Sequence, residues 1–362
     1  MQCNMALDRI ALSHFRNHRQ TELRGTAQFN LLWGENGAGK TNILEAISLL
    51  APGRGLRRAP LPDLPGQQGE GGFQIGASLI EQGHESARLG TYVEADRPGR
   101  RLVRVNGAET SAQSLSEWLA IGWLTPAMDG LLMDSAGARR RYLDRLALAL
   151  RPDHARHVSR YETALRERNK LLEENREATW LDAIEAQVAA HGAAISANRA
   201  ELVATLTEEL TALPDAPFAK PKLTYLPGGP AGSEELRAEL ARTRGRDRAA
   251  GRTLTGPHRD ELDVVMAGSG QAAASCSTGE QKAMLIALTL AHAVLAAEGR
   301  PGVLLLDEVA AHLDPVRRAA LFERLRMGKA QVWLTGTEAG PFEDILEEAA
   351  VWLVSGGTVE RV

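Results

Sequence analysis

The chain has 362 residues, a formal net charge of −4, 44% hydrophobic residues and 24% charged residues. This composition is typical of a globular protein of one and a half to two domains, and it excludes a polybasic nucleic-acid coat. With only Cys3 and Cys276, no apolar run of membrane-spanning length and no secretory leader, we expect a cytoplasmic protein without membrane contact.

The first predicted elements are two strands within residues 7–33, leading into a glycine-rich turn and a helix from residue 40. Gly34, Gly39, Lys40 and Thr41 match the pattern G-x-x-x-x-G-K-[ST], with a strand at 29–33 before it. Glycines at 34, 37 and 39 let backbone N–H groups surround nucleotide phosphates, which Lys40 reaches, while Thr41 holds Mg²⁺. A chance glycine turn is the alternative, but both the strand and the helix that the motif requires are present.

After a loop at 52–72, strands at 73–80, 87–95 and 101–105 predict an antiparallel β-meander. Three basic groups are candidates for DNA contacts. They are Arg54, Arg57 and Arg58; Arg139, Arg140 and Arg141; and Arg242, Arg244, Arg246, Arg248 and Arg252. A solvated face or a structural ion pair explains each group equally well.

Helix formers dominate from about residue 126. We predict a helix at 139–150, a second with Pro152 in its first turn, and a third capped by Thr179 that runs to about 213. The third carries an apolar stripe at heptad-like spacing, which we interpret as a bundle core with His191 at a helix interface. A proline-rich connection at 214–230 and a short helix at 234–241 follow.

The last third alternates strands, at 262–266, 303–306, 331–334 and 350–354, with helices at 280–298 and 315–325, an α/β pattern. The apolar run VLLLD ends in Asp307, which would hold Mg²⁺, and Glu308 would polarise the attacking water. Asp314 lies on the loop after this pair. A buried strand with an acidic turn is the alternative.

The segment SCSTGEQK at 275–282 precedes an apolar helix. Ser277 and Gly279 at its start form an anion-binding helix terminus, and the segment resembles the signature motif of ABC-type ATPases. There, one protomer's signature caps the γ-phosphate held by the other, which implies an ATP-sandwiched homodimer. An ordinary N-capped helix is the alternative.

Lys40 and Asp307 lie far apart in the chain with a helical block between them, as in head-and-arm ATPases. In detail, the chain resembles the RecF family of bacterial recombination mediators, a branch of the SMC/ABC-type ATPases, over essentially its whole length. The shared motifs are NLLWGENGAGKTNILEAISLL with GRGLRR, WLTPAMDGLLMDSAGARRRYLDRL, YETALRERNKLL, RTLTGPHRDEL and LLLDEVAAHLD.

The resemblance implies an α/β fold: an ABC/SMC-like P-loop ATPase head, with a mixed sheet and an antiparallel β-meander, and an inserted, mainly α-helical arm. We expect the head to comprise 1–125 and 251–362, and the arm 126–250. The implied function is ATP-dependent DNA binding in repair, replication, recombination and the SOS response. The dimer would bind double-stranded DNA near single-strand gaps and help RecO and RecR load RecA, with a weak, DNA-stimulated ATPase as the switch.

The resemblance also assigns roles to residues. ATP would be bound by Gly34, Glu35, Asn36, Gly37, Ala38, Gly39, Lys40, Thr41 and Asn42, with Ser277 and Gly279; Mg²⁺ by Thr41 and Asp307. The catalytic residues would be Lys40, Asp307 and Glu308. The D-loop residue would be Asp314. DNA would be contacted by Arg57, Arg58, Arg139, Arg140 and Arg141.

The chain departs from the family at three places. Glu280 stands where a glutamine is usual, and Asp307-Glu308 where two aspartates are usual. The segment at 126–129 lacks the acidic residue expected directly after the neighbour of Pro126. No histidine follows the strand at 331–334, where many ABC ATPases place one, so we expect Thr335 or Thr337 near the γ-phosphate.

The main alternative is the ATPase subunit of an ABC transporter, which the long helical insertion disfavours. A nuclease of the overcoming-lysogenisation type would need a further domain after Asp314, and a structural chromosome protein would need much longer arms.

Overall fold

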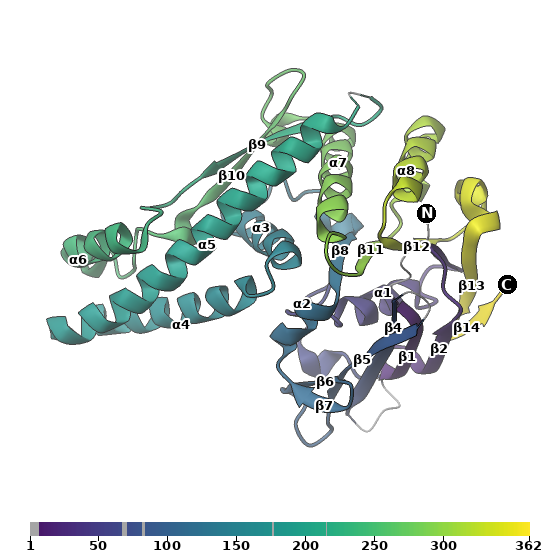
Figure 1. The fold of residues 1–362 in the computed structure, drawn as a ribbon, viewed down its shortest axis with the longest axis horizontal. Coiled ribbons are helices and arrows are strands. Elements are labelled where there is room, and N and C mark those ends of the chain that lie inside the picture. Colours follow the sequence, from purple (N-terminus) through teal and green to yellow (C-terminus); the bar gives the residue numbers. More distant parts are fainter. Residues whose placement is uncertain (1–6, 67–70, 82–83, 176, 215) are drawn as a thin grey trace. The chain divides into compact units, whose positions relative to one another are not determined.

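The computed structural model describes residues 7–66, 71–81, 84–175, 177–214 and 216–362. The chain forms two compact units (Figure 1). Unit 1 comprises the described parts of 1–129, 215–218 and 285–362, and unit 2 those of 130–214 and 219–284.

One sheet of unit 1 is mixed, with strand order β14-β13-β3-β12-β11-β8. Its strands are β3 (Phe29–Trp33), β8 (Ala120–Leu124), β11 (Gly302–Leu306), β12 (Gln331–Gly336), β13 (Ala349–Ser355) and β14 (Thr358–Arg361). All neighbours pair in parallel except β13 and β14. β11 and β12 are buried along their whole length, and β11 accordingly reads as a continuous apolar run rather than as an alternating pattern.

The second sheet of unit 1 is antiparallel, with order β2-β1-β4-β5-β6-β7. It consists of β1 (Leu7–Phe15), β2 (His18–Arg24), β4 (Phe73–Glu81), β5 (His84–Val93), β6 (Arg101–Val105) and β7 (Ala108–Thr110). The predicted β-meander is therefore confirmed. The core of unit 1 lies around α1 (Lys40–Ser48), whose Ile43, Leu44 and Ile47 are fully buried. Unit 1 also contains the α-helices α2 (Leu115–Trp118) and α8 (Pro315–Met327).

Unit 2 is mainly helical. It contains α3 (Ala136–Leu150), α4 (His154–Glu173), α5 (Ala178–Ala212) and α6 (Ser233–Ala249), with a two-stranded sheet of β9 (Pro221–Leu226) and β10 (Glu261–Met266). The long α5 runs beside α4 (Figure 1). Val188 and Ile195 of the predicted apolar stripe pack in a core with Tyr161, Leu236 and Leu240, which confirms a bundle core. The boundary between the units falls within α7 (Thr278–Ala296).

Several predicted boundaries are wrong. The connection at 214–230 contains β9, and α6 extends to Ala249 instead of ending at 241. Thr179 lies inside the first turn of α5, whose N-cap is Glu177, and Pro152 precedes the N-cap Asp153 of α4. Strands β7, β8 and β14 were not predicted. Residues 251–284, which we expected in the head, belong to the mainly helical unit 2. The division of the chain into a head with an inserted arm stays a proposal.

Among the described residues, none of the helices is long and apolar enough to cross a membrane. Cys276 is a buried free thiol, and Cys3 lies outside the described residues.

Candidate functional site

The turn between β3 and α1 can be built only with glycine at two positions. Gly34 has φ +148°, and a Cβ there would lie 2.1 Å from the Val354 carbonyl oxygen. Gly39, the N-cap of α1, has φ +118°, and its Cβ would lie 2.7 Å from side-chain atoms of Asn17 and His18. The turn therefore brings backbone N–H groups and the first turn of α1 together without side chains in the way.

Two hairpins contact this turn through the carbonyl oxygens of Ala38 and Gly39. The Ala38 carbonyl oxygen accepts hydrogen bonds from Asn17 Nδ2 at 2.9 Å and from the Gly357 N–H at 3.0 Å. The Gly39 carbonyl oxygen lies 3.0 Å from His18 Nε2. Asn17 lies in the β1–β2 turn, His18 is the first residue of β2, and Gly357 lies in the β13–β14 turn. The motif gave no signal for these three residues, because their contacts depend on chain segments far from the turn.

Lys40 is almost completely buried, and its Nζ donates to the carbonyl oxygens of Gly34 at 2.5 Å and Glu35 at 2.9 Å. Burial lowers the pKa of Lys40, while the negative charges of Glu308 and Asp307 act in the opposite direction. The Lys40 ammonium therefore lies at the turn and interacts electrostatically with the acidic pair, and its contact with nucleotide phosphates stays a prediction.

The acidic pair follows β11, at the carboxyl end of the parallel strands. Asp307 Oδ1 accepts a hydrogen bond from Thr41 Oγ1 at 2.9 Å, so the two predicted Mg²⁺ ligands meet although 266 positions separate them. Burial raises the pKa of Asp307, and the hydrogen bonds from Thr335 and Thr41 partly offset this. A hydroxyl and a carboxylate oxygen are ligands that Mg²⁺ takes, so the residues fit this ion.

Arg57 contacts two residues of α1. Its Nη1 donates to Asn42 Oδ1 at 2.6 Å and lies 3.1 Å from Glu45 Oε2. The buried Glu45 carboxylate also pairs with Arg16 through two bonds of 2.9 Å. Arg57 and its neighbour Arg58 are both exposed, with Arg57 in a structural ion pair as well.

The signature segment begins α7 with a capping box. Ser277 donates its N–H and its O–H to Glu280 Oε2, each at 2.8 Å, and its Oγ accepts from the Glu280 N–H at 3.3 Å. These bonds lower the pKa of Glu280. Gly279 is exposed. Asp314 caps α8, where its Oδ1 accepts from the Arg317 N–H at 3.0 Å.

The three consecutive arginines on α3 differ in their surroundings. Arg139 pairs with Glu261 at 2.8 Å, and Arg140 Nη1 donates to the Asp260 carbonyl oxygen at 2.8 Å. Arg141 is exposed. The alternative interpretation, a structural ion pair, therefore holds for Arg139.

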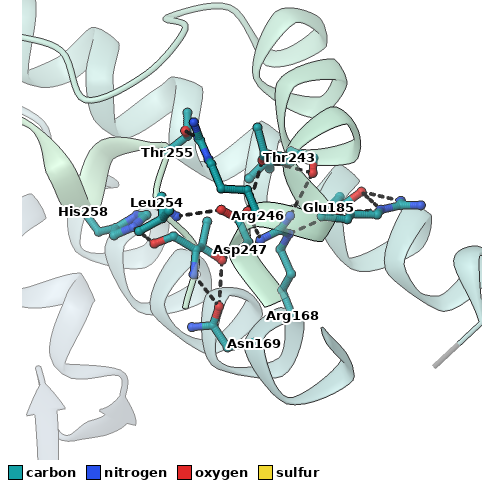
Figure 2. Close-up of polar contacts among 12 residues, drawn as sticks. Arg168, Asn169, Glu185, Thr243, Arg246, Asp247, Leu254, Thr255 and His258 are labelled. Carbon is teal, nitrogen blue, oxygen red and sulfur yellow. Dashed lines mark hydrogen bonds and ion pairs between the residues drawn. The ribbon is translucent and has the colours of Figure 1, made fainter. Parts of the chain in front are cut away.

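A buried polar cluster in unit 2 was not foreseen from the sequence (Figure 2). The fully buried Arg168 guanidinium of α4 pairs with Glu185 of α5 at 3.0 Å and with Asp247 of α6 at 2.8 Å. It also donates to Thr253 Oγ1 at 2.6 Å and to the Leu240 carbonyl oxygen at 2.8 Å. The cluster ties three helices to the loop that carries the GPHRDEL motif.

The predicted histidine at a helix interface is confirmed. His191 of α5 lies with its Nδ1 3.1 Å from His157 Nδ1 of α4.

Comparison with known proteins places these features in a family. Residues 6–359 match the family model described as RecF/RecN/SMC N terminal domain. The chain is 44% identical over 374 residues to the DNA replication and repair protein RecF of Mesorhizobium japonicum, covering 99% of this chain and 98% of the relative. It is 46% identical over 365 residues to the protein of the same name from Allorhizobium ampelinum, covering 97% of each.

Solved structures share the fold. The recombination mediator protein RecF-ATP in the RecFOR pathway superimposes with a TM-score of 0.87 at 23% identity, covering 100% of this chain and 99% of that one. An Smc head bound to the C-winged helix domain of ScpA gives 0.57 at 14% identity, covering 99% and 97%. The predicted ABC/SMC-like α/β fold is confirmed.

Proposed function

This chain belongs to the RecF family of DNA replication and repair proteins, and from that membership we propose that it is an ATP-driven switch for DNA binding. The single observation that carries the proposal is the bond between Thr41 and Asp307, which joins the phosphate-binding turn to the acidic strand end. The relatives favour this function over the ABC transporter subunit.

In the proposed reaction, the backbone N–H groups at the start of α1 and the Lys40 ammonium bind the phosphates of ATP. Thr41 and Asp307 would hold Mg²⁺, which when bound neutralises charge on the β- and γ-phosphate oxygens. Glu308 accepts a proton from the attacking water, and Lys40 stabilises the charge on the transferred group. Hydrolysis is weak and serves to end the ATP-bound state.

The site is completed by a second copy of the chain. Ser277 caps the 19-residue α7, whose first turn at Gly279 presents the positive end of a helix dipole, which suits the γ-phosphate held by the other copy; the Ser277 N–H is bonded to Glu280 Oε2 within the chain. Asp314, the cap of α8, lies on the loop expected at the same dimer interface. ATP therefore acts as the link between two copies.

The proposed partners follow from the family. The ATP-bound dimer binds double-stranded DNA beside single-strand gaps and works with RecO and RecR to load RecA, in the cytoplasm. Phosphate contacts come from the exposed Arg57, Arg58 and Arg141, with Arg139 and Arg140 contributing less because their side chains are half-buried.

The test measures ATP affinity, ATP turnover and binding to gapped DNA for the unmodified chain, Lys40→Ala and Glu308→Gln. Lys40→Ala should lose ATP affinity, whereas Glu308→Gln should keep it and lose turnover by about 100-fold or more, because a general base is removed. In all three proteins, DNA affinity should be high when ATP is bound and low when it is not. DNA binding that ignores ATP would contradict the proposed switch.

A further inference from the structure

Thr335 lies at the centre of the acidic site without a role in the reaction described above. It belongs to β12, which pairs in parallel with β11 in the register Leu306 to Leu334. Asp307, directly after the end of β11, therefore lies beside Thr335 of β12. The Thr335 side chain is almost completely buried.

Its hydroxyl makes two hydrogen bonds at once. Thr335 Oγ1 donates to Asp307 Oδ1 at 2.8 Å and accepts from the Glu308 N–H at 2.9 Å. Both distances are in the ordinary range for such bonds. The single hydroxyl thus connects the carboxylate expected to hold Mg²⁺ with the backbone of the residue expected to activate water.

The backbone of Glu308 needs such support. Its φ is +54°, in the left-handed region that a residue with a Cβ rarely adopts. The neighbouring strand holds this conformation through the bond from the Glu308 N–H to Thr335. Since φ sets the direction of the Cα–Cβ bond, the bond to Thr335 also sets where the Glu308 carboxylate points.

We propose that Thr335 is a positioning residue for ATP hydrolysis, acting through Glu308 and Asp307 and not on ATP binding; this rests on the proposed function. In the step concerned, the water oxygen bonds to the γ-phosphorus and the bond from that phosphorus to the β,γ-bridging oxygen breaks. The electron pair of the broken bond leaves with ADP, and a water proton passes to the Glu308 carboxylate. A misdirected carboxylate slows this step while ATP stays bound.

The test compares Thr335→Val, which keeps the shape and removes both hydrogen bonds, with Thr335→Ser, which keeps the hydroxyl. Thr289→Val is the matched control, because Thr289 is also buried and its hydroxyl donates to the Leu285 carbonyl oxygen within α7. The measurements are kcat, ATP affinity, thermal unfolding, and the lifetime of the ATP-bound dimer by light scattering.

Thr335→Val should lower kcat by about tenfold or more and leave ATP affinity within about threefold, because only the alignment of reacting groups is lost. The lifetime of its ATP-bound dimer should increase by the same factor by which kcat falls. Thr335→Ser should recover most of kcat, and Thr289→Val should match the unmodified chain.

An unchanged kcat in a folded Thr335→Val protein would overturn the inference, as would an equal loss of ATP affinity or a failure of Thr335→Ser to recover kcat. If the unmodified chain bound ATP but did not hydrolyse it, the proposed function itself would be contradicted and the inference with it.

Discussion

Gly357 shows how a residue far from the phosphate-binding turn can control it. Its N–H donates to the Ala38 carbonyl oxygen, and a Cβ on it would lie 2.1 Å from the Asn17 carbonyl oxygen. The two hairpins that hold the turn therefore meet at a point where only glycine fits.

Gly357→Ala should accordingly weaken ATP binding by about tenfold, or 1.4 kcal/mol, because the hairpin must move away from the turn. Gly356→Ala is the matched control, since Gly356 also has positive φ but its Cβ would meet open space. Titration with a fluorescent ATP analogue measures both. Equal affinities of the two variants would contradict the role of Gly357.

His18 makes the same region sensitive to acid. Burial lowers the pKa of His18, and its hydrogen bonds to the carbonyls of Gly39 and Gly357 only partly oppose this. Below an unfolded-state pKa of about 6.5, the unfolded chain binds the proton more readily than the folded one. The contribution of the neutral His18 ring to the free energy of unfolding is therefore fully present above that pH, and it is lost as the pH falls below it.

We therefore expect His18→Gln to lose less stability than the unmodified chain between pH 7.5 and about 5.5, because the titrating group is gone. Urea unfolding at each pH measures the difference. His84→Gln, at an exposed position on β5, should keep the acid sensitivity of the unmodified chain. The same loss on acidification in His18→Gln would show that His18 is not the responsible group.

At the scale of residues, the sequence predicted the groups whose chemistry is local. The P-loop pattern identified Lys40 and Thr41, and the end of an apolar strand identified Asp307. It could not identify Asn17, Gly357 or the two bonds of Thr335, because these depend on which strands become neighbours.

At the scale of elements, α6 shows why sequence pattern underestimates some helices. Its apolar positions Leu236 and Leu240 are followed on the buried face by Thr243 and Asp247, which bond to each other and, through Asp247, to Arg168. The buried face continues as a polar cluster, so the hydrophobic pattern stops near the predicted end while the helix goes on.

Strands were missed for related reasons. β9 was not predicted because it begins with Pro221, although proline is tolerated as the first residue of a strand. The apolar run of β8 was too short to distinguish from a helix segment.

Arg168→Met should destabilise unit 2 by about 3–5 kcal/mol, because it leaves the buried carboxylates of Glu185 and Asp247 without this partner. Amide hydrogen exchange should accelerate in α4, α5 and α6 and stay unchanged in the sheets of unit 1. Arg166→Met, an exposed position on the same helix, should change stability by about 0.5 kcal/mol or less. Similar exchange in both variants would mean that the cluster contributes little.

At the scale of the whole molecule, the net charge of −4 requires DNA to be bound by local basic surfaces. Replacing Arg57 and Arg58 together by Ala should lower DNA affinity equally across sequences. The salt dependence of log K should fall by about 0.9 for each DNA phosphate that the variant no longer neutralises. Fluorescence anisotropy over a salt series measures this, with Arg326→Ala, an exposed residue paired with Glu348, as control. An unchanged slope would remove the pair from the DNA interface.

The most direct test of the ATP switch is molar mass by light scattering, with ADP, with ATP, and with ATP on Glu308→Gln, each with and without gapped DNA. We expect a monomer with ADP and a dimer with ATP, with the dimer favoured by DNA and longest-lived in Glu308→Gln. A monomer under all these conditions would contradict the ATP-linked dimer, because Ser277 and Gly279 would then not complete the site of a second copy.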